Sequence, residues 1–162
     1  MCVELRMNDI TIREAGAGDI DVLVRHRRMM WWDMGRRNEA ALGLMEEAAQ
    51  EYFSTAVVEG SYRGFLAVAA GARVVAGAGI VLSAWPGMLG QRSPRRAMIL
   101  NMYVEREYRR RGIARALMAN MISWCRENEF KSVGLHASDE GRSLYEQLGF
   151  KPTNEMRLDF KE

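Results

Sequence analysis

The stretch of sequence that decides the fold covers residues 97–122 and reads AMILNMYVEREYRRRGIARALMANMI. Its first part, 97–104, is almost entirely apolar and predicts a buried strand. Beyond Gly112, apolar residues recur three or four apart, as on the inner face of an amphipathic helix: Ile113, Leu117, Met118, Met121, Ile122 and Cys125. We predict that this helix ends near Asn128. The strand therefore leads through a basic turn into the N-terminus of a helix.

The basic turn concentrates positive charge in a chain whose net charge is +2. Against Glu105 and Glu107 it carries five arginines: Arg106, Arg109, Arg110, Arg111 and Arg115. The first N–H groups of a helix have no intrahelical partner and point at a ligand, and Gly112 lets a ligand approach the backbone. Each contact of an anion with a helix end contributes about 0.3–2 kcal/mol. The turn is either a pyrophosphate site or a solvated surface segment, and its place before a helix favours the first.

Other phosphate-bearing partners are disfavoured. The sequence contains neither a G-x-x-x-x-G-K-[ST] loop nor a G-x-G-x-x-G loop that opens a helix, which argues against mononucleotides and dinucleotides. Nucleic-acid binders usually carry a larger basic excess, with aromatic residues between the basic ones. Here only Tyr103 and Tyr108 accompany the arginines. We therefore expect no nucleic-acid partner.

Strand and helix patterns alternate through the rest of the chain. Before the stretch they predict a strand near 10–12, helices over 20–34 and 38–54, and a hairpin of 65–69 with 74–82. After it they predict a strand over 132–137, a helix over 141–148 and one or two final strands in 150–160. This order predicts an α/β fold with a mixed sheet.

Composition limits the class of protein. The 162 residues, 48% of them hydrophobic, suffice for one core, and we expect a single domain, 1–162. The apolar runs are shorter than the roughly 18 residues that span a bilayer, and charged residues within Met1–Asp9 argue against a signal peptide. Cys2 and Cys125 lie far apart and lack metal-ligand spacing. We expect a cytoplasmic protein with reduced thiols, no metal and no membrane partner.

Two motifs in the second half of the chain resemble those of one known family. Arg109-x-x-Gly112-x-Ala114 resembles a [QR]-x-x-G-x-[GA] cofactor motif, and residues 138–150, SDEGRSLYEQLGF, resemble an N-x-x-A-x-x-L-Y-x-x-x-G-F block. Both motifs are typical of the Gcn5-related N-acetyltransferases (GNAT), and the resemblance is close across Met98–Phe150. It implies the GNAT fold, an α/β structure with a mixed, mostly antiparallel sheet whose central parallel strands splay apart, flanked by helices.

The resemblance also implies an activity and a site. The activity is that of an N-acetyltransferase, which moves an acetyl group from acetyl-CoA to a primary amine by direct attack. The backbone of Met102, Tyr103 and Val104 would pair with the pantetheine and acetyl groups, with the Val104 N–H as oxyanion donor. The pyrophosphate would contact the motif residue Arg109 and the amides of Arg110, Arg111, Gly112, Ile113, Ala114 and Arg115. Tyr145 occupies the position whose hydroxyl protonates the departing CoA thiolate.

The sequence departs from the family pattern at the general base and at one cofactor contact. Family members often place a glutamate base where this chain has Met98 and Val133, and neither side chain can take a proton. Asn101 and His136 lie nearby on the predicted strands, and an ordered water or an amine that arrives neutral would also serve. Ser138 replaces an asparagine that commonly contacts the cofactor, so we keep it as a candidate contact.

The resemblance leaves the amine acceptor open. In the family the acceptor pocket usually involves the first two helices, where this chain has Trp31, Trp32 and Asp33. These residues either build core or line a pocket for an apolar or aromatic amine, with Asp33 orienting its ammonium. We expect a small-molecule amine or a peptide N-terminus as partner, and by family analogy a homodimer. The alternative function is an acetyl-CoA-binding module or sensor of the same fold without turnover.

Overall fold

The computed structural model describes residues 9–160, and within them the strands form one five-stranded sheet in the order β1-β2-β3-β4-β5. Their bounds are Thr11–Glu14, Tyr62–Val68, Val74–Ala84, Arg95–Val104 and Gly134–Leu135. Neighbours from β1 to β4 pair antiparallel, and β4 pairs with β5 parallel. The predicted mixed, mostly antiparallel sheet is confirmed. The predictions for Cys2 and for the segment before Asp9 fall outside the described residues.

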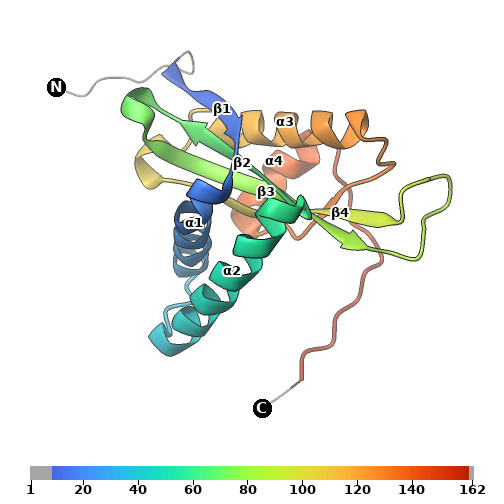
Figure 1. The fold of residues 1–162 in the computed structure, drawn as a ribbon, viewed down its shortest axis with the longest axis horizontal. Helices are drawn as coiled ribbons and strands as arrows, with labels where there is room; N and C mark the ends of the chain where they lie inside the picture. Colours follow the sequence, from blue (N-terminus) through green and yellow to red (C-terminus); the bar gives the residue numbers. More distant parts are fainter. Residues whose placement is uncertain (1–8, 161–162) are drawn as a thin grey trace.

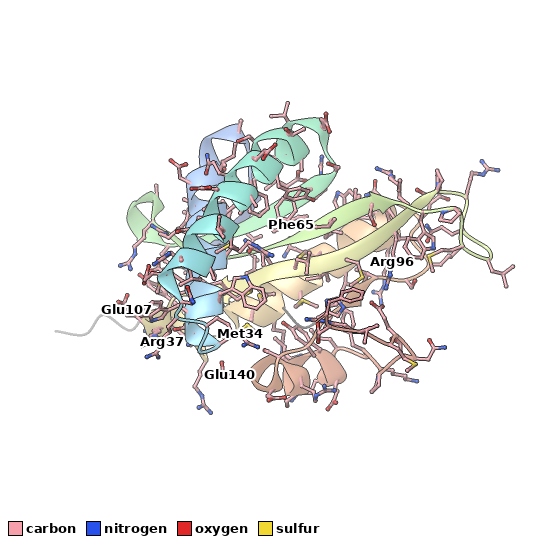
Figure 2. All side chains as sticks on the ribbon, turned by 90° about the horizontal axis from the view of Figure 1, so that it is seen from below. Met34, Arg37, Phe65, Arg96, Glu107 and Glu140 are labelled. Atoms are coloured by element: carbon pink, nitrogen blue, oxygen red, sulfur yellow. The ribbon has the colours of Figure 1, made fainter. Side chains whose placement is uncertain are left out.

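Helices cover both faces of the sheet (Figure 1). One face carries α1 and α2, and the other carries α3 and α4; their bounds are Ile20–Asp33, Glu39–Glu59, Ile113–Glu127 and Asp139–Gln147. Figure 2, turned by 90°, shows the sheet between the two helical layers. Among residues 9–160, no helix is both long and apolar enough to cross a membrane.

Each helical layer buries its apolar side against the sheet. The α3 side chains predicted to face inward do so: Ile113, Leu117, Met118, Met121 and Cys125 are buried. On the other face, Leu23 of α1 and Phe53 of α2 pack against Tyr62 and Leu66 of β2. Burying a side chain of this kind contributes about 1.5–3 kcal/mol. Burial also raises the pKa of the Cys125 thiol to about 11, so the thiol stays neutral at physiological pH.

β4 carries a bulge in its middle. The register with β3 shifts between Gly77 and Gly79, so that two β4 residues, Asn101 and Met102, oppose Ala78. Asn101 has a φ of +62°, in the left-handed region that asparagine tolerates better than most residues. Because a bulge bends its strand and increases the local twist, β4 changes direction here.

β4 and β5 separate after a short parallel contact. Met98 pairs with Gly134 and Ile99 with Leu135. Within residues 9–160, no strand pairs with β4 residues 100–104 on that side. The predicted splay of the central parallel strands is confirmed, and backbone groups of β4 that point into the gap have no ladder partner.

α2 and α4 differ from their predicted bounds because of their caps. α2 runs to Glu59 rather than 54 and ends at Gly60, whose φ of +77° stops a helix at little cost. α4 begins at Asp139 rather than 141, since the Ser138 Oγ accepts a hydrogen bond from the Gly141 N–H at 3.2 Å.

The predicted final strands in 150–160 are wrong. This segment has no regular structure and runs away from the sheet toward the C-terminus (Figure 1). Its alternating apolar residues Met156, Leu158 and Phe160 are 94%, 77% and 90% exposed, so the alternation buries nothing. β5 covers only 134–135 of the predicted 132–137. The short edge therefore offers almost no ladder to a further strand.

Candidate active site

The basic turn leads from the splayed end of β4 into the N-terminus of α3. Gly112, with a φ of +80°, is the N-cap of α3, and Arg110 also has a positive φ, +61°. The first intrahelical bond runs from the Ala116 N–H to the Gly112 carbonyl oxygen at 3.0 Å, so the N–H groups of 113–115 have no intrahelical partner. This is the geometry that a pyrophosphate site requires, because free N–H groups and the helix dipole both attract an anion.

Two arginines of the turn are committed to structural contacts. Arg109 pairs with Asp33 at the end of α1, and its Nε donates a hydrogen bond to the Val104 carbonyl oxygen at 2.9 Å. Arg106 pairs with the other oxygen of Asp33 at 2.6 Å. Partial burial opposes ionisation of this carboxyl, but the hydrogen bonds from Arg106 and Arg109 win and lower the pKa of Asp33. Asp33 therefore holds the turn against α1.

The remaining arginines of the turn lie on its exposed side. Arg110, Arg111 and Arg115 are exposed. The Arg111 guanidinium lies 5.4 Å from the centroid of the Tyr108 ring, and Arg115 donates a hydrogen bond to the Gln147 Oε1 of α4. Neither contact neutralises a charge, so the start of α3 remains strongly positive.

Tyr145 lies on the inner face of α4 and is 8% exposed. Its ring covers Gly141, where the family block has alanine: a Cβ there would lie 2.8 Å from the Tyr145 ring. Burial raises the pKa of Tyr145, so its hydroxyl keeps its proton at neutral pH, as a general acid requires. Tyr145 lines a cavity of about 670 Å³ that also touches Met98 of β4 and Cys125 of α3.

Neither of the two positions where the family often has a glutamate supplies a general base. A Cβ on Gly134 would lie 2.7 Å from the Met98 Sδ, so this thioether fills the space beside β5, and Val133 packs against the core. The His136 side chain is 73% exposed, and its Nε2 lies 3.6 Å from the Glu155 Oε1. Among residues 9–160, no three His, Cys, Asp or Glu side chains gather as metal ligands would.

Known proteins share both the sequence pattern and the fold of this chain. The sequence model of the Acetyltransferase (GNAT) family matches residues 26–150. The chain belongs to the GNAT family. A GCN5-related N-acetyltransferase from Ralstonia eutropha JMP134 is 30% identical to it with a TM-score of 0.85, and the match covers 93% of this chain and 98% of that one.

Other solved structures share the GNAT fold. A predicted acetyltransferase from Clostridium acetobutylicum, solved with acetyl-CoA, is 25% identical with a TM-score of 0.83, covering 94% of this chain and 96% of that one. An aminoglycoside acetyltransferase from an uncultured soil metagenomic sample, solved with sisomicin, is 17% identical with a TM-score of 0.64, covering 96% and 95%. The second likeness shows the fold alone. No curated protein matches the chain.

A groove between α1 and α2 of this GNAT chain lies on the helices where the resemblance places the acceptor. Two neighbouring cavities form it, of about 590 and 360 Å³, and both touch Arg27 and Met45. Trp31 lines the larger cavity, and its Nε1 is buried without a hydrogen-bond partner. Trp32 instead packs under the Arg37 guanidinium, 5.3 Å from its ring centroid. Of the predicted acceptor residues, the structure brings Trp31 to the groove.

Sequence reasoning missed two groove residues of this GNAT protein, Arg27 and Tyr62, and it considered Asn101 only as a base. Asn101 is 3% exposed, and its Nδ2 donates a hydrogen bond to the Leu23 carbonyl oxygen at 3.1 Å, which joins the β4 bulge to α1. Two signals were available: an arginine on the apolar face of the predicted helix 20–34, and an asparagine inside an apolar strand.

Proposed function

We propose that this GNAT chain is an N-acetyltransferase that moves an acetyl group from acetyl-CoA to a primary amine by direct attack. One observation carries the proposal: β4 leaves β5 at residues 100–104 and runs into the N-terminus of α3 at Gly112. An unpaired strand edge can pair with an extended ligand that carries amides, and a helix N-terminus beside it can bind phosphate. The acetyltransferase from Clostridium acetobutylicum that was solved with acetyl-CoA supports this ligand.

The residues proposed to hold acetyl-CoA form two groups along this path. The backbone of Met102, Tyr103 and Val104 pairs with the pantetheine and acetyl groups. The pyrophosphate meets the backbone amides of Arg110, Arg111, Gly112, Ile113, Ala114 and Arg115. It also meets the exposed guanidinium groups of the three arginines among them. Arg109 acts mainly by holding the turn against Val104. Ser138, whose Oγ caps α4, stays a candidate contact.

The proposed reaction forms a C–N bond and breaks a C–S bond. The amine nitrogen attacks the thioester carbonyl, whose oxygen gains negative charge beside the Val104 N–H. The Tyr145 hydroxyl donates its proton to the departing thiolate and regains one from solvent. Because Met98 and Val133 cannot accept a proton, the proton lost by the amine goes to water. Most of the acceleration then comes from holding two substrates in line.

A second candidate function is an acetyl-CoA-binding module or sensor without turnover. The missing carboxylate at positions 98 and 133 favours it. In the enzymatic case the acceptor is a small-molecule amine or a peptide N-terminus. The homodimer and the cytoplasmic location belong to the same proposal and rest on family analogy and composition.

Calorimetric titration with acetyl-CoA tests the cofactor site. Gly112→Glu should abolish binding, because the new side chain adds bulk, negative charge and strain at a φ of +80°. Release of the free CoA thiol in the presence of a panel of primary amines then separates the enzyme from the sensor. Equal affinity of the wild type and the Gly112→Glu variant would refute the pyrophosphate site, and binding without release for any amine would favour the sensor.

A further inference from the structure

Arg27 is a half-buried cation on the inner side of α1 that has no acidic partner. Within residues 9–160, no Asp or Glu oxygen pairs with it, whereas its neighbours are paired: Arg25 with Glu105 at 3.4 Å and Arg28 with Glu39 at 2.6 Å. Burial lowers the pKa of Arg27, but a guanidinium stays charged in proteins. The guanidinium carbon lies 6.0 Å from the centroid of the Trp31 ring, but an aromatic face does not neutralise a charge, and burying a charge without a counter-ion is costly. The position therefore calls for an anion that comes from outside the described chain.

Two further polar atoms beside Arg27 are buried and complete no hydrogen bond among residues 9–160: the Tyr62 hydroxyl and the Asn101 Oδ1. The two residues are 2% and 3% exposed, and the Asn101 Nδ2 is already bonded to the Leu23 carbonyl oxygen. Burial and the nearby Tyr52 raise the pKa of Tyr62, against smaller opposing effects of Arg27 and the Asn101 amide. The hydroxyl thus keeps its proton and can donate, while the Asn101 Oδ1 can only accept. Buried polar groups are nearly always paired in native proteins, so unpaired ones indicate a ligand.

These three polar groups line one cavity, of about 360 Å³. Its volume lies in the range of small-molecule sites, about 300–1,000 Å³. The rest of its lining is mainly apolar or aromatic and includes Met45, Phe53, Val81 and Leu100. Among residues 9–160, no Asp or Glu lines this cavity or the adjoining one of about 590 Å³, which adds Arg36 and Arg37. The cavity suits a ligand with an apolar body and one negative group.

The cavity reaches the bulge of β4. Leu100 and Asn101 line it, and they directly precede Met102–Val104, the backbone proposed to hold the acetyl group. A ligand in the cavity therefore has one end near Arg27 and can bring another to the β4 bulge. The Asn101 Oδ1 can accept a hydrogen bond from the N–H of an amine placed there.

We infer that the acceptor is a small amine that also carries a carboxylate and an apolar side chain, an apolar α-amino acid or a close analogue. Its carboxylate pairs with Arg27 and its amino group meets the Asn101 Oδ1. This inference rests on the proposed function and deepens it. It also separates the two acceptor classes, because the terminal amine of a peptide is followed by a neutral amide rather than a carboxylate.

Pairs of substrates with and without the carboxylate test the inference by turnover. L-phenylalanine and L-methionine are compared with L-phenylalaninamide and L-methioninamide, with CoA thiol release as the readout. We expect the acids to exceed their amides in kcat/KM by about tenfold or more, because a hydrogen-bonded ion pair is lost in the amide. Arg27→Met should raise KM for the acids by about 10- to 100-fold and should change KM for the amides much less. Arg27→Lys should restore part of the preference.

Stability separates recognition from a structural role of Arg27. Because Arg27→Met removes an unpaired buried charge and keeps an unbranched side chain, we expect its Tm to equal or exceed that of the wild type. Arg25→Met, on the exposed side of the same helix, serves as the control and should keep the acid preference. A preference for acids that survives in Arg27→Met, or turnover of amides equal to that of acids, overturns the inference and leaves the proposed transfer intact.

Binding without turnover distinguishes the two proposals. Calorimetric titration with L-phenylalanine, in the presence of CoA, is run on the wild type and on Arg27→Met. Binding that is lost in the variant, together with no CoA release for any amine, would uphold the carboxylate site and refute the transfer reaction. If the acids neither bind nor react, the inference is wrong whatever other amines do.

Discussion

At the scale of single residues, Tyr145 and Cys125 line the same cavity but suit different tasks. Burial raises the pKa of both groups, that of Cys125 to about 11. Both therefore carry their protons at neutral pH. A protonated thiol is a poor nucleophile, whereas a protonated hydroxyl is what a general acid needs. The direct-attack reaction accordingly assigns a role to Tyr145 and none to Cys125.

Tyr145→Phe removes the proposed proton donor and keeps the ring that packs on Phe150. We expect kcat to fall by about 10²- to 10⁴-fold, because the thiolate then leaves without a positioned acid. The affinity for acetyl-CoA, measured by calorimetry, should hardly change. Since the pKa of Tyr145 lies above its ordinary value, the wild type should not lose kcat to ionisation of this group between neutral pH and about pH 10. An unchanged kcat in the variant would leave Tyr145 as a packing residue.

At the scale of elements, α1 connects the two halves of the site. Leu23 in its middle accepts a hydrogen bond from Asn101 at the β4 bulge. Asp33 at its end binds Arg106 and Arg109 of the basic turn. The helix that lines the groove proposed for the acceptor therefore also positions the turn that leads to the proposed cofactor site.

Asp33→Asn tests this connection. The variant leaves Arg106 and Arg109 without their carboxylate, which should cost about 1–3 kcal/mol and lower Tm by about 2–4 °C for each kcal/mol in a protein of this size. We also expect weaker acetyl-CoA binding, because the turn loses its anchor. Glu47→Gln, exposed on α2, is the charge-matched control and should change neither quantity.

The lowered pKa of Asp33 determines how folding stability changes with pH through the same ion pairs. This pKa is lower in the folded protein than the ordinary value of an aspartate, so the folded state favours the ionised carboxylate. The stability from this group is present above the unfolded pKa and is lost as pH falls through the folded one. The difference in Tm between the wild type and Asp33→Asn should therefore be smaller below about pH 4 than at neutral pH.

At the scale of the whole molecule, the docking of α1 on the sheet makes stability depend on pH through His26. This side chain is 1% exposed, its ring nitrogens have no hydrogen-bond partner in the described part of the chain, and its ring centroid lies 5.2 Å from that of Tyr103. Burial, assisted by Arg25, lowers the pKa of His26 from 6.5 to about 4. The folded state therefore binds this proton less readily than the unfolded chain does.

We expect the free energy of unfolding to fall by roughly 3 kcal/mol between pH 6.5 and pH 4 through His26 alone. The stability is complete above the unfolded pKa and decreases as pH falls toward the folded one. Urea unfolding of His26→Phe across this range should show a shallower dependence, because the titrating group is gone. His136→Gln, at a side chain that is 73% exposed, should behave like the wild type.

The sequence by itself determined the β4–α3 segment and the position of Tyr145. Strand alternation, helical periodicity and glycine positions are local properties, and they suffice for Gly112 at the start of α3 and for the inward face of that helix. They failed at 150–160, because an alternating pattern becomes a strand only where a neighbouring edge offers a ladder, and β5 is too short to do so.

Only the tertiary structure decided which charges are free. Asp33 lies 73 and 76 residues from Arg106 and Arg109, and no local pattern indicates that it takes up both. Arg27, Tyr62 and Asn101 come from a helix and two strands and meet in one cavity. Within residues 9–160, the Arg27 charge has no carboxylate partner and the Tyr62 hydroxyl and Asn101 Oδ1 have no hydrogen bond. This emerges only from packing, because pairing and burial depend on distances between segments remote in sequence.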